Sequence, residues 1–382
     1  MTTWQIAAVG MASLFAAILL VVTQRWHARW TGDFEDSGVQ KHHTGSPPRI
    51  GIVPLVIGVL VGIKFMADGD LQAAGSASSL LSLMVVASLP VVLLGLADDV
   101  TKRVPPRVRM VGAIVAGLAA ISLLGLRVER VDIPLLDTLV AFWPVSVAVT
   151  VLMVCGFTNA MNIIDGLNGL AGGLAVLMLG ATAVVAAQMG DTVVLQICVV
   201  VMMTVGGFLL VNFPRGMVFL GDGGAYFVGF LLVQIWLLLL SRNPSLTPLF
   251  VVAVAFLPTM ETIFSIYRRR FHGRRSRRRD AMLADRLHLH TLIYHRRTLR
   301  AMKQLPWAEA WVANAAAALA LLSFGVLPML AALVAPTSAA WALLVIGTAT
   351  LGYLVWFKRL VGFRRFRVFA RAARAEPVAE AL

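Results

Sequence analysis

Four short clusters of polar side chains interrupt an otherwise apolar sequence. They contain Asp98 and Asp99; Asn159, Asn162 and Asp165; Asn212 and Asp222; and His288 and His290. Carboxylate oxygens without nearby cysteines suit Mg²⁺, with Mn²⁺ as the alternative, and Mg²⁺ usually binds through one or two carboxylates together with the phosphates of a substrate. The sequence therefore predicts a divalent-metal site that handles a phosphorylated substrate.

Basic and glycine-rich segments accompany these clusters. Lys102, Arg107 and Arg109 follow the aspartate pair, and these residues and the loop at 40–51 would complement phosphate charge. The stretches GLNGLAGG and GDGG let the backbone approach a ligand, and each opens a predicted helix whose N-terminus favours anions. Taken singly, a cluster has simpler explanations, because Asp often caps helices and Asn and Gly often form turns. Two adjacent carboxylates are harder to explain in that way, since like charges raise each other's pKa.

Membrane-spanning helices must position these clusters. The chain has 382 residues, of which 59% are hydrophobic and only 14% charged, against about 25% charged in a soluble domain. A spanning helix needs about 20 apolar residues, and eleven segments qualify, so we predict an all-α polytopic integral membrane protein with about eleven transmembrane helices. The segments lie at about 3–22, 50–67, 79–97, 110–126, 138–156, 168–188, 192–211, 224–241, 248–267, 307–333 and 339–357.

The distribution of basic residues predicts the orientation of these helices. The first apolar run is preceded by no Lys or Arg, which indicates a retained helix with a periplasmic N-terminus and a cytoplasmic C-terminus. In that orientation 29 of the 33 Lys and Arg residues face the cytoplasm, which accounts for most of the net charge of +14 without a nucleic-acid partner. The arginine-rich run at 268–279 is interpreted as an anchor to anionic membrane lipids, with direct phosphate binding as the alternative.

This layout predicts a single transmembrane domain over 1–357 and a basic cytoplasmic tail over 358–382. All four polar clusters then fall at cytoplasmic helix ends, which predicts one site mouth on that face. The cytoplasmic loops that carry the clusters and the basic residues are 23–49, 98–109, 157–168, 212–224 and 268–306.

Several single residues have more than one interpretation. Glu261 is the one carboxylate predicted inside a span, where an acid is a functional candidate. It follows Pro258 and lies about two turns before Arg268, so we favour a structural role in which it steadies a basic partner. His288 and His290 would point apart on a helix but lie on one side of an extended loop. Cys155 and Cys198 are interpreted as core residues.

At these residues the sequence resembles the polyprenyl-phosphate N-acetylhexosamine-1-phosphate transferase superfamily. Five motifs appear in the order typical of that superfamily, over about residues 40–295. They are KHHTGSPPRIG, ADDVTK, NAMNIIDGLNGLAGG, VFLGDGG and HLH. The resemblance implies a multi-pass protein of the bacterial inner membrane that takes a UDP-sugar from the cytoplasm and undecaprenyl phosphate from the bilayer. It also implies transfer of the sugar 1-phosphate to the lipid, with release of UMP.

The resemblance also implies roles for particular residues. Asp222 would bind Mg²⁺ together with Asp98, and Asp98 and Asp99 would lie near the lipid phosphate. Asp165, Lys102 and the two histidines would act in catalysis. The residues implied in substrate binding are Asn159, Asn162, Asn168, Asn212, Phe219, His42 and Arg49.

Two departures from the family pattern narrow the choice of UDP-sugar donor. Asn168 stands where the family block usually has a second aspartate. The histidine motif reads HLHT and not the three consecutive histidines of the peptidoglycan enzyme, and Thr291 stands where a sugar-transferring relative commonly has another histidine. These differences favour a UDP-N-acetylhexosamine such as UDP-GlcNAc, with cell-surface polysaccharide synthesis such as O-antigen as the setting. The phospho-N-acetylmuramoyl-pentapeptide transferase activity of peptidoglycan synthesis is the alternative.

Mechanism and assembly leave further alternatives. We favour direct attack by the lipid phosphate, because a phosphate monoester with a second pKa near ~6 is already mostly dianionic at neutral pH; a covalent aspartyl-phosphate route is the competing scheme. A secondary transporter of an anionic solute is the rival from another class, but transporters commonly bind near the midplane between repeats. A homodimer is left open.

Overall fold

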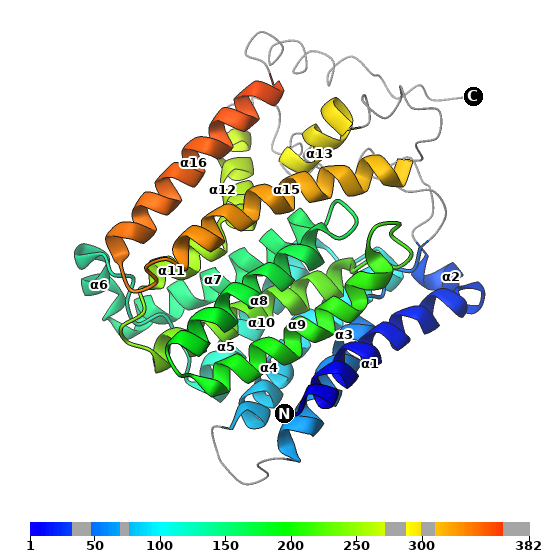
Figure 1. Ribbon diagram of the computed structural model, residues 1–382, viewed down its shortest axis with the longest axis horizontal. Coiled ribbons are helices and arrows are strands. Elements are labelled where there is room, and N and C mark those ends of the chain that lie inside the picture. Colours follow the sequence, from blue (N-terminus) through cyan, green and yellow to red (C-terminus); the bar gives the residue numbers. More distant parts are fainter. Residues whose placement is uncertain (33–46, 69–75, 272–287, 299–309, 362–382) are drawn as a thin grey trace.

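Apolar helices make up nearly all of the described chain. The computed structural model describes residues 1–32, 47–68, 76–271, 288–298 and 310–361, and every regular element in these ranges is a helix (Figure 1). Nine of the helices in these ranges are long and apolar enough to cross a membrane. The prediction of an all-α polytopic membrane protein is confirmed at this level. The nine are α1 (Thr3–Val22), α4 (Ala77–Thr101), α5 (Pro106–Leu124), α7 (Trp143–Ile164), α8 (Leu170–Gln188), α9 (Thr192–Asn212), α10 (Gly221–Arg242), α15 (Ala310–Ala332) and α16 (Ala339–Val361).

Two of the eleven predicted spans have a different form. The segment predicted at 50–67 contains α3 (Ile52–Ala67), which has 16 residues and is shorter than the other nine. The segment predicted at 248–267 is divided into α11 (Pro248–Val254) and α12 (Phe256–Phe271), which are bent by 79°. Pro258 explains the break, because proline has no N–H to donate to the carbonyl four residues earlier, that of Val254. The total of eleven spans and the orientation of the termini stay predictions.

Three short helices connect the long ones. They are α2 (Gln24–Thr31), α6 (Pro134–Val140) and α13 (Leu289–Ile293), and a single π-helical turn, Tyr294–Thr298, follows α13. In α2 the guanidinium groups of Arg25 and Arg29 lie over the rings of Trp26 and Trp30. Such pairs suit the boundary between apolar and polar surroundings.

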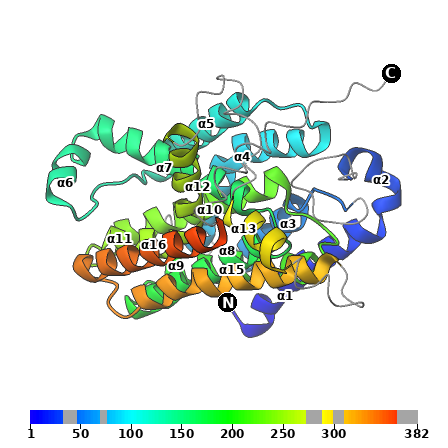
Figure 2. The same ribbon diagram turned by 90° about the horizontal axis from the view of Figure 1, so that it is seen from above.

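Helix α10 lies at the centre of the bundle. Its residues from Gly221 to Leu239 are buried, whereas α1, α5 and α16 expose much of their apolar surface. Helices α15 and α16 lie on one flank and α1 and α3 on the other, with α10 between them (Figures 1 and 2). The indole N–H of Trp236 donates to Thr182 Oγ1 of α8 at 3.0 Å, so the polar atom of this buried ring is satisfied.

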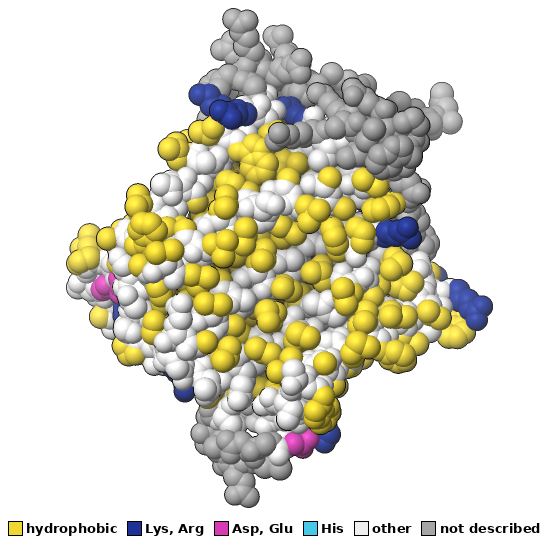
Figure 3. Space-filling model, in the orientation of Figure 1, with side chains coloured by type: hydrophobic (Ala, Val, Ile, Leu, Met, Phe, Trp, Pro, Cys, Tyr) yellow, Lys and Arg dark blue, Asp and Glu magenta, His cyan; other side chains and the backbone are white. Residues whose placement is uncertain are grey.

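The outer surface of the bundle is apolar. Hydrophobic side chains cover most of the face in Figure 3, and the Lys and Arg side chains lie at its edges. Without a membrane, an apolar surface this extensive would be unusual for a soluble monomer. The surface therefore agrees with a bundle whose walls face lipid.

The connectors at the end of the bundle away from the aspartates are tied by an ion pair. Asp191, between α8 and α9, accepts from Arg242 Nε at 2.8 Å and from Asn243 Nδ2 at 3.0 Å at the end of α10. Burial alone would raise the pKa of Asp191, but the hydrogen bonds from Arg242, the Val194 amide and Asn243 hold that pKa below its ordinary value. These contacts fix α10 against the α8–α9 pair.

Helix ends at the opposite end of the bundle extend beyond the predicted spans. Helix α4 continues to Thr101, so Asp98 and Asp99 lie in its last turn and not in a loop. Helix α7 continues to Ile164, so Asn159 and Asn162 lie inside the helix, which corrects the loop predicted at 157–168. Hydropathy ends a span at the first polar residue, whereas backbone hydrogen bonding continues until a residue breaks it.

Helices α4 and α10 cross at two glycines next to the aspartates. A Cβ added to Gly95 would lie 2.5 Å from the Cα of Gly223 and 2.7 Å from its nitrogen. These are backbone atoms that cannot turn aside, so the crossing requires glycine.

We expect Gly95→Ala to lower the thermal stability of the detergent-purified protein, because overpacking of a backbone contact costs about 1–3 kcal/mol. The matched control is Gly206→Ala in α9, where an added Cβ would meet nothing within 4 Å, and its melting temperature should be unchanged or slightly higher. Equal melting temperatures for the two variants would contradict the close crossing.

Candidate active site

Asp99 holds the N-terminus of α10. Its carboxylate oxygens accept from the backbone N–H groups of Asp222 at 2.8 Å and Gly223 at 2.9 Å, and the residue is 1% exposed. The first N–H groups of a helix have no partner within the helix, and the positive end of the helix dipole favours a carboxylate there. Asp99 therefore joins the end of α4 to the start of α10 and sets the position of Asp222.

Asp98 and Asp222 share one arginine. Arg109, in the first turns of α5, donates from the same guanidinium nitrogen to Asp98 Oδ2 at 2.9 Å and to Asp222 Oδ2. The other oxygen of Asp98 accepts from the Val104 backbone N–H at 2.9 Å and so closes the turn between α4 and α5. The two carboxylates thus converge on a single cationic position.

Arg49 supplies a second positive charge. Its guanidinium lies 3.3 Å from Asp222 Oδ1 and 3.7 Å from Asp99 Oδ1, and its side chain is 27% exposed. It is also close enough to Asp165 to interact with that carboxylate electrostatically. Residues far apart in the sequence therefore meet in one acidic centre flanked by two arginines.

The segment at 47–51 carries Arg49 into this centre. The Arg49 N–H donates to the Thr31 carbonyl at 2.8 Å, and the Phe219 N–H donates to the Pro48 carbonyl at 2.9 Å. Gly221 has φ 73°, and a Cβ on it would collide with the Arg49 carbonyl. The start of α10 therefore requires glycine for both its backbone angle and its neighbour.

Asp165 follows the last residue of α7 and lies close to Asp99 and Arg49. Burial raises the pKa of Asp165 from its ordinary value near 3.8 to about 7, and the charge of Arg49 acts in the opposite direction. A carboxyl group with a pKa near neutrality changes its charge readily in response to a cation or a phosphate. Such perturbed groups gather at functional sites.

The amide residues link two loops of the site. Asn212 accepts from the Gly169 N–H at 2.7 Å and donates to the Val218 carbonyl at 2.7 Å. Asn168 donates from Nδ2 to the Pro214 carbonyl at 3.1 Å. Both ends of the Asn212 amide are thus bound to backbone, so in this state it holds the loops together; direct contact of Asn212 or Asn168 with a substrate stays a prediction.

The other predicted binding residues have varied positions. Asn159 donates to the Cys155 carbonyl of its own helix at 2.7 Å, and Asn162 lies half-buried one turn later. Lys102 ends α4 and donates to the Gly32 carbonyl at 3.2 Å. Phe219 is half-buried beside the segment at 47–51.

Some of the predicted elements lie outside the described residues. They include His42 with its neighbour His43, most of the loop at 268–306, and the tail from 362 onward. The roles predicted for these residues stay predictions.

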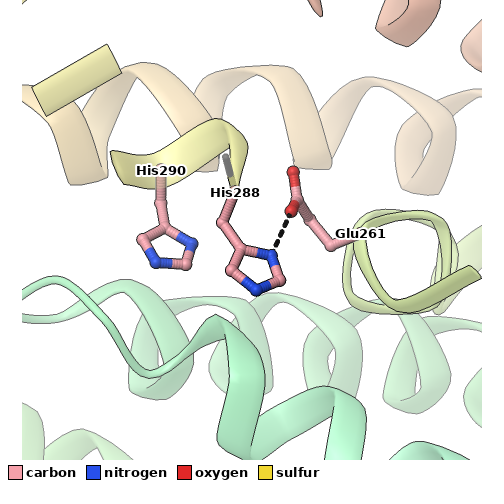
Figure 4. Close-up of side chains that lie close together, drawn as sticks. All are labelled: Glu261, His288 and His290. Atoms are coloured by element: carbon pink, nitrogen blue, oxygen red, sulfur yellow. Dashed lines mark hydrogen bonds and ion pairs between the residues drawn. The ribbon is translucent and has the colours of Figure 1, made fainter. Parts of the chain in front are cut away.

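The two histidines of the HLH motif lie side by side. His288 has extended backbone just before α13 and His290 lies within that helix, yet their rings are parallel and 5.3 Å apart (Figure 4). A Cβ on Gly166 would collide with His290 Nε2, so the histidine pair abuts the loop that begins at Asp165. The HLH motif is thereby joined to the same end of the bundle as the aspartates.

Sequence reasoning missed three contributors to the site. Arg109 was noted only as a basic neighbour of the aspartates, Tyr353 was not singled out, and Asn314 of α15 accepts from the Asn168 N–H at 2.8 Å. Glu261 was noted, and its partner is His288, at 3.1 Å from Nδ1 to Oε2. Glu261 carried a signal in the sequence as an acid within an apolar segment, and Arg109 as a basic residue near the aspartates. Tyr353 and Asn314 carried none, because contacts between distant helices leave no local pattern.

Comparisons with known proteins show which sequences this chain resembles. Residues 81–240 match the model of glycosyl transferase family 4. The chain is 28% identical over 260 residues to a probable undecaprenyl-phosphate N-acetylglucosaminyl 1-phosphate transferase of Bacillus subtilis, a match that covers 68% of this chain and 70% of the relative. It is 28% identical over 271 residues to a decaprenyl-phosphate N-acetylglucosaminephosphotransferase of Mycobacterium leprae, covering 65% of this chain and 66% of the relative.

A shorter match points to a neighbouring branch. The chain is 30% identical over 135 residues to a phospho-N-acetylmuramoyl-pentapeptide-transferase of Staphylococcus carnosus, which covers 35% of this chain and 41% of the relative. The match to the family model includes Asp98, Asp99, Asp165 and Asp222. The chain is therefore similar to glycosyl transferase family 4 over residues 81–240, and to relatives named as polyprenyl-phosphate N-acetylglucosamine 1-phosphate transferases over about two thirds of its length.

Proposed function

We propose that this protein transfers N-acetylglucosamine 1-phosphate from UDP-N-acetylglucosamine to a polyprenyl phosphate, undecaprenyl phosphate in particular, and releases UMP. The observation that carries the proposal is the acidic centre, in which four aspartates from three segments of the chain meet at one end of the bundle beside Arg49 and Arg109. The names of the relatives in Bacillus subtilis and Mycobacterium leprae support the same donor and acceptor class.

The placement of the centre suits two substrates of opposite solubility. It lies where α4, α7 and α9 end and α10 begins, at one end of an apolar bundle. A water-soluble nucleotide sugar can arrive from the aqueous side while a polyprenyl phosphate arrives along the membrane. We propose that this end faces the cytoplasm of a bacterial inner membrane, as the distribution of basic residues predicts.

The muramoyl-pentapeptide reaction is the second candidate, favoured by the match to the Staphylococcus carnosus enzyme. That match covers about half the length of the Bacillus subtilis match. The HLHT motif of this chain also lacks the three consecutive histidines of that enzyme class, so we place the N-acetylglucosamine donor first.

The residues at the centre fit a divalent cation. Asp98 Oδ2 and Asp222 Oδ2 both contact a single nitrogen of Arg109, which means that one cation can reach both carboxylates at once. Hard carboxylate oxygens suit Mg²⁺. We propose that Asp98 and Asp222 hold Mg²⁺, which when bound would neutralise charge on the diphosphate and on the departing UMP.

The chain's own residues would then organise a direct transfer. An oxygen of the lipid phosphate forms a bond to the sugar-linked phosphorus, and the bond from that phosphorus to the oxygen retained by UMP breaks. Arg49 and Arg109 would bind phosphate oxygens, and Lys102 would offset further charge. The lipid phosphate needs no strong base, since its second pKa near ~6 leaves it mostly dianionic at neutral pH. Positioning and charge compensation would do most of the catalysis.

Removal of the Asp222 carboxylate should abolish turnover. With UDP-N-acetylglucosamine, undecaprenyl phosphate and Mg²⁺, we expect Asp222→Asn to reduce UMP release by about 10²–10³-fold, the usual effect of removing one strong electrostatic contact. EDTA should have a similar effect on the wild type, and excess Mg²⁺ should reverse it. Asp68→Asn, which alters an exposed acid beside Lys64, is the control and should retain full activity. Normal turnover by Asp222→Asn would refute the assignment.

Arg109 should compete with the metal. Because its guanidinium occupies the position shared by Asp98 and Asp222, we expect Arg109→Gln to tighten Mn²⁺ binding about tenfold in the absence of substrate, equivalent to about 1.4 kcal/mol. Mn²⁺ binding to the detergent-purified protein can be followed by electron paramagnetic resonance. The control is Arg107→Gln, an exposed arginine of the same helix turn. Unchanged or weaker binding by the Arg109 variant would show that the two cations do not share one position.

Asp165 should make the stability of the ligand-free protein depend on pH. The folded protein keeps the Asp165 proton up to about pH 7, whereas the unfolded chain releases it near pH 3.8. Stability is therefore lost as pH rises between these values, by at most about 1.4 kcal/mol per pH unit, and levels off above pH 7. The melting temperature of the wild type minus that of Asp165→Asn should decrease from pH 5 to pH 7 and stay constant above pH 7. Parallel curves over the whole range would contradict the raised pKa.

A further inference from the structure

Glu261 is a fully buried carboxylate with three donors from two other parts of the chain. It lies on α12 and is 0% exposed. His288 Nδ1 lies 3.1 Å from Oε2, the Leu289 N–H lies 3.1 Å from Oε1 and 3.3 Å from Oε2, and the Tyr353 hydroxyl donates to Oε1 at 2.8 Å. Both carboxylate oxygens are thus bound at the junction of α12, α13 and α16.

The free-energy cost of burying this carboxylate must be offset by the groups that bind it. Burial of an ionised acid is unfavourable unless it is paired and hydrogen-bonded, and well-packed apolar residues often replace such pairs without loss of stability. The aromatic rings around it could close the junction without it, because Phe264 packs edge to face against Tyr353 at 5.5 Å and Arg268 lies over Phe264 and Phe357. These rings cannot supply a hydrogen-bond acceptor that holds the His288 imidazole in one orientation.

The contact determines which nitrogen of His288 carries a proton. An ionised carboxylate only accepts hydrogen bonds, so the ring must donate from Nδ1. Nε2 is then the ring nitrogen that carries no proton, and the ring cannot turn over without losing the contact with Glu261. Figure 4 shows Glu261 on one side of the His288 ring and His290 on the other.

The histidine pair faces the loop that carries Asp165. The two rings are nearly parallel, at an interplanar angle of 6°, and His290 Nε2 abuts Gly166. Glu261 contacts His288, His288 stacks on His290, and His290 abuts Gly166, so the histidines connect Glu261 to the loop that carries Asp165.

We propose that Glu261 is a positioning residue for the transfer reaction, which acts through His288. It fixes the Nδ1–H form and the orientation of that ring, so that Nε2, which then carries no proton, accepts from a sugar hydroxyl in one defined geometry. This inference rests on the proposed transferase function. Tyr353 and the Leu289 N–H hold the carboxylate itself in place from α16 and from the start of α13.

A metal at the same residues is the competing interpretation. One ligand atom each of Glu261, His288 and His290 lie within 4.8 Å of one another. A bound Zn²⁺ would need the Glu261 oxygen and the His288 nitrogen to point at the ion, whereas here they point at each other. The hydrogen-bonded arrangement is therefore the one we argue, and metal binding is an outcome of the test.

A double-mutant cycle separates positioning from general structural support. We expect Glu261→Gln to lower kcat by about 10–100-fold, the range found for residues that orient a functional histidine, with a smaller change in KM. His288→Gln should lower kcat at least as much, and the double variant should match His288→Gln within about twofold, because Glu261 has no effect once its partner is gone. Multiplicative losses would overturn the proposal. Glu261→Asp should restore part of the loss, and Glu129→Gln, an exposed acid, is the control.

A second measurement does not depend on turnover. In full-length detergent-purified protein labelled with ¹⁵N-histidine, the His288 signals, assigned by loss in His288→Gln, should report a proton on Nδ1. Glutamine can donate as well as accept, so Glu261→Gln should shift His288 toward a mixture of the two ring forms while the other histidines keep their signals. Unchanged His288 signals in Glu261→Gln would overturn the proposal even if the enzyme is active.

The same labelled samples test the competing site and the proposed function. Stoichiometric Zn²⁺ binding by the wild type that is lost in both Glu261→Gln and His290→Gln would overturn the proposal in favour of a metal site. The expected histidine signals could appear although no UDP-sugar supports UMP release. In that case the contact between Glu261 and His288 is supported, whereas the proposed function and the role of Glu261 in transfer are both refuted.

Discussion

The whole site depends on holding several carboxylates close together at the end of an apolar bundle. Asp98, Asp99, Asp165 and Asp222 are close enough to repel one another, and backbone N–H groups and two arginines offset this repulsion. Backbone N–H groups at the start of α10 bind Asp99, and a helix N-terminus is the part of a helix that favours negative charge. Arg109 binds Asp98 and Asp222, and Arg49 lies among the rest. The site therefore forms only where α4, α5 and α10 pack together.

Glycines permit this assembly because they let backbone and charge approach closely. Gly95 and Gly223 bring α4 against α10, and Gly221 lets the segment at 47–51 pass beside the start of α10. Gly166 makes room for His290 in the same way. The GDGG and DGLNGLAGG sequences thus serve first as packing elements, and their openness to a ligand follows from the same lack of side chains. A phosphate-binding interpretation of such glycines is incomplete without these contacts.

The sequence predicted the parts of the structure that depend on local pattern. Apolar runs located a helix in each of the eleven predicted segments, and the acids at the helix ends were recognised as one group. Hydropathy could not find where helices end, because α4 and α7 continue through polar residues such as Asp98 and Asn162. It also missed the break between α11 and α12, although Pro258 marks it.

Pairings between distant residues were the least predictable part. Asn212 was assigned to a substrate on the basis of family resemblance, and the structure shows its amide bound to the backbone at Gly169 and Val218. Glu261 contacts His288, which is 27 residues away in the chain, and Tyr353, which is 92 residues away. The sequence contains the residue types that form such contacts, but the contacts themselves are set by how α12, α13 and α16 pack.

Two polar systems therefore meet in this protein, and different helices carry them. The aspartates and arginines belong to α4, α5, α10 and the segment at 47–51, whereas Glu261, His288 and Tyr353 belong to α12, α13 and α16. They meet at the loop from Asp165 to Gly169, which Asn212 and Asn314 hold from two further helices. A diphosphate bound across this loop would contact both systems at once. The geometry of transfer would then depend on how α12 holds α13. A buried carboxylate with three donors fixes the direction of the contact as well as its distance, which apolar packing alone does not.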